Sequence, residues 1–118
     1  MAGELSIKCN IQFNKSGASV ARSGSVVADV AGDAFTHQIQ SIGTSEELLA
    51  KSADITTPGY CYIVNLDATN FVEFGVTTGV YSVRVEAGDI ALFRLNGVSL
   101  YAKADTGACL IEYIIIEQ

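Results

Sequence analysis

The sequence predicts an all-β protein, a single antiparallel β-sandwich of jelly-roll type. Short apolar runs of strand length recur along the whole chain of 118 residues. Several of these runs alternate apolar and polar residues, and a period of two is typical of a strand with one face in a core. Glycine, asparagine and aspartate separate the runs at short intervals, as they do in sandwiches and barrels. The length suits one domain, which we expect to span residues 1–118.

The N-terminal part of the chain contains three predicted strands. Residues 5–14 alternate apolar and polar without interruption, and residues 15–19 follow as a turn. Residues 25–31 predict a second strand that ends at a Gly-Asp pair. Residues 35–39 alternate again and predict a third strand, with His37 on its apolar face.

The rest of the chain adds one ambiguous segment and further strands. Residues 43–50 are compatible with a helix, because Thr44 or Ser45 followed by acidic residues can cap one. The apolar segment after them is short, which favours a loop that leads into a short strand. Asn96-Gly97 predicts a tight type I′ hairpin, since that turn needs positive φ at both positions. Strands are expected at residues 60–66, 71–75, 81–86, 90–95, 99–104 and 108–117.

The last predicted strand is apolar on both faces, so it lies in the centre of a sandwich or is covered by a neighbour. One face carries Cys109, Ile111, Tyr113 and Ile115, and the other carries Leu110, Ile114 and Ile116. Residues 1–14 are a candidate arm that pairs with a neighbouring subunit, although an ordinary intramolecular strand fits equally well. The candidate interface residues are Leu5, Ile7, Ile11, Phe13, Leu110, Ile114 and Ile116.

The composition favours an assembly. Hydrophobic residues make up 49% of the chain and charged residues only 17%, and so few charges do not cover a small protein's surface. We therefore expect a homo-oligomer. The net charge is −6 and the 7 basic residues are scattered singly, which argues against a nucleic-acid partner. No apolar run is long enough to span a membrane, and no signal peptide is expected.

The reactive residues form no catalytic or metal-binding motif. His37 is the only histidine, and its place on the apolar face of a strand favours a hydrogen-bonded, structural role. Cys9, Cys61 and Cys109 are far apart in apolar, strand-like runs, which favours free, buried thiols in a reducing compartment. We expect no metal, no cofactor and no enzymatic activity.

Three segments of the second half resemble small virion proteins of tailed bacteriophages. They are residues 65–75 (NLDATNFVEFG), 88–95 (GDIALFRL) and 100–112 (LYAKADTGACLIE). The resemblance rests on strand and turn residues. It implies a non-enzymatic virion component with a jelly-roll-like sandwich, assembled in the cytoplasm of a host bacterium. Within that setting it favours a capsid decoration (cement) protein, a homotrimer that binds the major capsid protein on the outside of the phage head.

Three alternatives stay open. The first is a neck, tail or fibre-associated adaptor of the virion with the same fold. The second is a carbohydrate-binding sandwich, which would need an exposed aromatic platform; the chain has no tryptophan, and Tyr81 and Tyr101 are its best candidates. The third is an enzyme of cupin or glycosidase type, which a single histidine and the absence of a distinctive carboxylate pair disfavour.

Overall fold

The computed structural model describes residues 3–118, and every regular element in them is a β-strand. Contacts divide the chain into two compact units, residues 1–31 and residues 32–118. The sequence predicted one domain with a candidate arm at residues 1–14. The first unit is longer than that arm, because its second strand returns along the first and pairs with no other strand.

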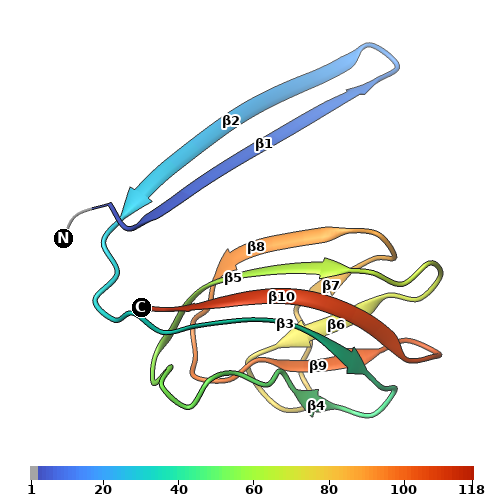
Figure 1. Cartoon of the computed structure of the whole chain (residues 1–118). Helices are drawn as coiled ribbons and strands as arrows, with labels where there is room; N and C mark the ends of the chain where they lie inside the picture. Colours follow the sequence, from blue (N-terminus) through green and yellow to red (C-terminus); the bar gives the residue numbers. More distant parts are fainter. Residues whose placement is uncertain (1–2) are drawn as a thin grey trace. The chain divides into compact units, whose positions relative to one another are not determined.

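The first unit is a long antiparallel hairpin (Figure 1). Strands β1 (Leu5–Lys15) and β2 (Ala18–Ala28) are paired over their full 11 residues. Ser16 and Gly17 connect them with φ of 51° and 87°, which is the backbone of a type I′ turn. The predicted first strand is confirmed. The second begins seven residues earlier than predicted, at Ala18 rather than Ser25, because its first half is polar or small and shows no apolar alternation.

The second unit is a sandwich of two four-stranded sheets that face each other (Figure 1). One sheet has the order β3-β10-β5-β8 and the other β4-β9-β6-β7. Their bounds are β3 Phe35–Ile42, β4 Glu47–Leu48, β5 Pro58–Asn65, β6 Val72–Gly75, β7 Val83–Val85, β8 Ile90–Arg94, β9 Tyr101–Ala104 and β10 Cys109–Glu117. Along the chain each strand lies in the opposite sheet from its predecessor, with the β6–β7 hairpin as the exception. This alternation is the jelly-roll arrangement, so the predicted fold class is confirmed.

Segment 43–50 contains only the two-residue strand β4, which confirms the predicted loop with a short strand. The predicted Asn96-Gly97 hairpin is wrong. Strand β8 pairs with β5 and strand β9 pairs with β4 and β6, so the segment between them crosses from one sheet to the other. Gly97 is not among the glycines with positive φ in residues 3–118. Long-range strand pairing has overridden the local turn preference.

The core lies between the two sheets. Its largest fully buried side chains include Tyr113, Phe74 and Ile63, which come from both sheets. Strand β10 is central in its sheet, and its residues alternate between buried and partly exposed. The Tyr113 hydroxyl reaches the edge of the core, where it accepts a hydrogen bond from Gln38 Nε2 at 2.7 Å and donates one to the Ala50 carbonyl at 2.5 Å.

One buried polar side chain connects the two sheets. Asn65, at the end of β5, is 1% exposed. Its Nδ2 donates to the carbonyls of Asn70 (2.9 Å) and Val85 (3.1 Å), and Val85 belongs to the other sheet. Its Oδ1 accepts from the Asp67 backbone amide at 2.9 Å. Residues 65–70, the start of the first segment of the phage resemblance, are therefore a structural turn.

Candidate functional site

The outer face of the sheet β3-β10-β5-β8 is largely apolar and exposed. Alternate residues of these strands point into the core, and the others point outward. The outward residues, here called the outer face, are Phe35, His37, Ile39, Ser41, Tyr60, Tyr62, Val64, Ile90, Leu92, Arg94, Leu110, Glu112, Ile114 and Ile116. Phe35, Ile39 and Ile90 are 64%, 57% and 61% exposed. A contiguous exposed apolar surface of this kind marks an interaction site, whereas apolar residues scattered singly over a surface do not.

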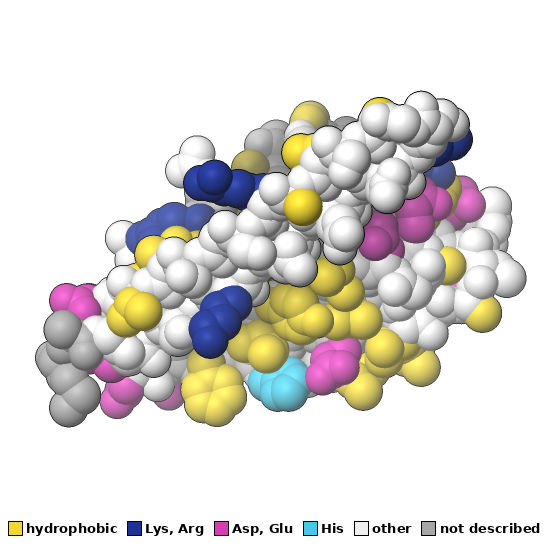
Figure 2. Space-filling view, turned by 90° about the horizontal axis from the view of Figure 1, so that it is seen from above, with side chains coloured by type: hydrophobic (Ala, Val, Ile, Leu, Met, Phe, Trp, Pro, Cys, Tyr) yellow, Lys and Arg dark blue, Asp and Glu magenta, His cyan; other side chains and the backbone are white. Residues whose placement is uncertain are grey.

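A histidine–carboxylate pair lies within this face. His37 Nε2 is 2.7 Å from Glu112 Oε2 across neighbouring strands. Figure 2 shows hydrophobic side chains gathered beside the histidine and an acidic side chain. The predicted hydrogen bond of His37 is confirmed. However, the apolar side of residues 35–39 is the outer face rather than the core, because β3 buries Thr36 and Ile42 instead.

The β1–β2 hairpin has an apolar face of its own. Residues opposite each other in the register share a side of the ribbon. One side, here called the arm face, carries Leu5, Ile7, Cys9, Ile11, Phe13, Lys15, Ala18, Val20, Arg22, Gly24, Val26 and Ala28. Ile11 is 66% exposed and Val20 is 58% exposed. An isolated two-stranded hairpin is at best marginally stable in water, so an apolar ribbon of this length requires a surface to lie on.

The predicted interface residues fall on these two faces. Four of them, Leu5, Ile7, Ile11 and Phe13, share the arm face. The other three, Leu110, Ile114 and Ile116, share the outer face. Whether they contact another molecule stays a prediction. The sequence reasoning missed their companions on β2 and β8, although the alternation in residues 90–94 carried a signal for the latter.

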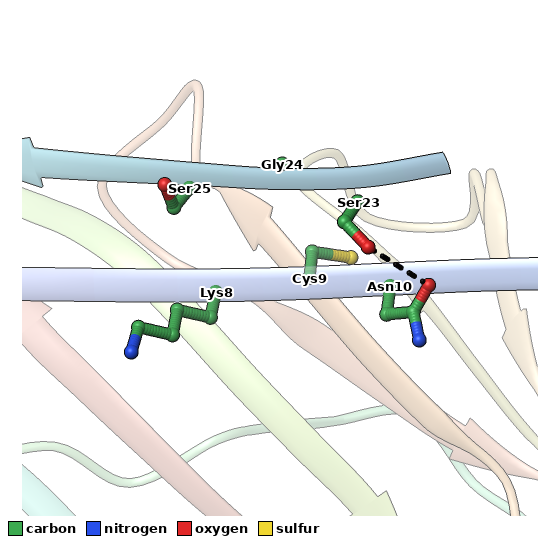
Figure 3. Close-up of a pocket in the computed structure, with 6 residues that line it drawn as sticks. All are labelled: Lys8, Cys9, Asn10, Ser23, Gly24 and Ser25. Atoms are coloured by element: carbon green, nitrogen blue, oxygen red, sulfur yellow. Dashed lines mark hydrogen bonds between the residues drawn. The ribbon is translucent and has the colours of Figure 1, made fainter. Parts of the chain in front are cut away.

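A hollow of about 370 Å³ lies over the middle of the hairpin (Figure 3). Its lining residues are Lys8, Cys9, Asn10, Ser23, Gly24 and Ser25. It forms where Cys9 is opposite Gly24, a residue at which an added Cβ would meet no atom within 4 Å. The predicted burial of Cys9 is wrong, since a two-stranded ribbon has no second layer to cover this thiol. No group of three metal-ligating side chains occurs within residues 3–118.

The other two thiols are buried, as predicted. Burial raises the pKa of Cys61 to about 12, so this thiol stays protonated and is a poor nucleophile at neutral pH. It therefore acts as a small apolar core residue.

Glu46 is an anchor for a loop of the sandwich. Its carboxylate accepts hydrogen bonds from the Gly79 amide (2.7 Å), the Tyr81 hydroxyl (2.5 Å) and the Thr78 hydroxyl. These hydrogen bonds lower the pKa of Glu46, and the bond from Thr78 has the largest effect. The hydrogen bond between Glu46 and Tyr81 raises the pKa of Tyr81 to about 12. Tyr81 is partly exposed, like Tyr101, but its hydroxyl is engaged in this structural contact.

Comparison of the chain with protein-family models, with curated proteins and with solved structures finds no match. The resemblance to phage virion proteins therefore stays a prediction. Within residues 3–118 there is no helix of the length and hydropathy needed to cross a membrane.

Proposed function

We propose that this chain is a non-enzymatic structural protein of a bacteriophage virion, a decoration protein that binds and stabilises the outside of the head. The observation that carries the proposal is the pair of exposed apolar faces, one on a sandwich and one on a hairpin arm. An apolar face on each unit is what a protein needs to hold a subunit lattice together.

The sandwich is suited to a mechanical role. Two four-stranded sheets enclose one continuous core, and the Asn65 side chain ties one sheet to the other. A scaffold of this kind presents the outer face as a fixed surface, so little conformational entropy is lost when a partner binds.

The charge distribution supports an exterior position. Residues 32–118 hold 4 of the 7 basic residues and 11 of the 13 acidic residues, which gives this unit a net charge of −7. Packaged DNA presents a dense array of phosphates that repels such a surface. An acidic sandwich is therefore better placed facing away from the genome.

The groups of the outer face favour contact over catalysis. His37 is hydrogen-bonded to Glu112, and its other neighbours on the face are apolar side chains such as Ile114, which is paired with it across β10. Aliphatic residues outnumber aromatic ones there, which suits a protein partner better than a sugar.

The test is quantitative mass spectrometry of purified virions from the phage that encodes the chain. A decoration protein would be present in a fixed ratio to the major capsid protein, and it would rebind to heads from which it had been stripped. A small fixed number of copies per particle would favour a neck or tail adaptor instead. Absence from virions, together with binding on a glycan array, would overturn the proposal in favour of a carbohydrate-binding module.

A further inference from the structure

We propose that the arm face of one copy lies on the outer face of a second copy, so that the chain assembles by exchange of its N-terminal hairpins. This contact concerns the isolated protein and holds whether or not the protein is a virion component.

The dimensions of the two faces agree. The 11-residue strands of the hairpin are about 35 Å long, and the 8- and 9-residue strands at the centre of the outer face are about 30 Å long at the usual rise per residue. Two strands cover a width of about 10 Å, so one arm face offers about 350 Å². A reciprocal exchange between two copies would bury about 1,400 Å² in total, which lies within the range of specific interfaces.

The charges of the two units are complementary. Residues 1–31 contain 3 basic and 2 acidic residues, a net charge of +1, and all 3 basic residues lie on β1 and β2. The sandwich unit carries the net charge of −7. An acidic sandwich therefore attracts a basic arm from another copy, and this attraction speeds encounter as well as orienting it.

One pair of opposite charges, among apolar residues in the middle of the two faces, gives the contact a register. Arg22 lies on the arm face, opposite Ile11. Glu112 lies on the outer face, opposite Ile39 and Val64. Arg22 has apolar neighbours on the arm face, and covering it without a partner would be costly. Glu112 binds His37 through Oε2, and its carboxylate can accept a further donor. Arg22 of one copy is well suited to pair with Glu112 of the next, since a guanidinium tolerates burial in an ion pair better than an ammonium does.

A second copy satisfies both faces at once, and a monomeric native mass, with the arm on its own sandwich, would overturn this choice. Because the arm face and the outer face belong to the same chain, a closed dimer or ring covers every copy of both. A different protein bound to the outer face would leave the arm face exposed to water.

The experiment compares the native mass and dissociation constant of the full chain with those of charge variants. Arg22→Glu and Glu112→Arg should each weaken association about tenfold or more, and the double variant should recover most of the loss. Lys8→Glu is the matched control, because it makes the same charge change on the opposite side of the hairpin. It should leave the constant within about threefold of wild type, since exposed charges contribute little. Circular dichroism checks that each variant is folded.

A second measurement uses the wild-type protein alone. Cys9 is the exposed thiol, at the centre of the arm face, whereas Cys61 and Cys109 are buried. Its rate of labelling by a maleimide should therefore rise on dilution, as the arm leaves the second copy. A monomeric wild type, a labelling rate independent of concentration, or a folded double variant that associates no better than the single ones would each overturn the proposal.

Discussion

Replacing Asn65 with alanine should destabilise the sandwich strongly, although the residue lies on neither the arm face nor the outer face. The substitution removes two donors and one acceptor that bind the Asn70 and Val85 carbonyls and the Asp67 amide. Since Asn65 is 1% exposed, water does not readily replace these hydrogen bonds.

The expected loss from the three hydrogen bonds is about 4–6 kcal/mol. Each hydrogen bond contributes about 1 kcal/mol, and a buried carbonyl left without a donor adds about 1–3 kcal/mol. A domain of this size has a free energy of unfolding of about 5–15 kcal/mol. The variant should therefore fold, but close to its limit of stability.

Urea unfolding measures the effect. Because the chain has no tryptophan, circular dichroism or tyrosine fluorescence reports the transition. Asn65→Asp should be at least as destabilised, since a carboxylate has no N–H to donate to the carbonyl oxygens of Asn70 and Val85 and would be repelled by them. Asn96→Ala is the control, because Asn96 is exposed and surface changes usually stay within about 0.5 kcal/mol. A loss below about 1 kcal/mol for Asn65→Ala would refute the account of this side chain as a tie between the sheets.

Three further predictions follow from other contacts. Gly75→Ala should lower the urea midpoint sharply or prevent folding, since a Cβ there would lie 1.9 Å from the Val80 carbonyl oxygen. Glu46→Gln should destabilise the protein at neutral pH. Because hydrogen bonds hold the pKa of Glu46 below its ordinary value of 4.5, the carboxylate's contribution is present above that pH and is lost as the pH falls through the lower, folded pKa. In the dilute native protein a maleimide should label Cys9 and leave Cys61 unmodified until the sandwich unfolds.

Each of these has an outcome that would contradict it. A normal midpoint for Gly75→Ala would mean that the backbone near Val80 can move away. A stability difference for Glu46→Gln that persisted unchanged to pH well below 4.5 would show that the loop depends on shape rather than on the charge. Equal labelling of Cys9 and Cys61 would contradict the burial of the core thiol.

Only part of the candidate site could be predicted from the sequence. Leu5 to Phe13 were predicted to form an apolar strand face, and they do. The alternate residues of β10 were likewise assigned to two faces correctly. Val20 and Val26 were missed because they join the arm face through their pairing with Phe13 and Ile7 on the other strand. The alternation within one strand does not show which residues lie opposite it.

Local pattern determined the strands themselves. A period of two is a property of consecutive residues and identified β1, β3 and β7, and apolar runs bounded by turn residues identified β5 and β10. Which strands pair, and which apolar side faces the core, depended on contacts between residues far apart in the chain. The predicted Asn96-Gly97 hairpin illustrates the first point, because the strands on either side of it, β8 and β9, pair with other strands in opposite sheets. Strand β10 illustrates the second. Both of its faces are apolar, so only closure of the two sheets decided that Ile111 would be buried and that Leu110 would be left, 52% exposed, on the outer face.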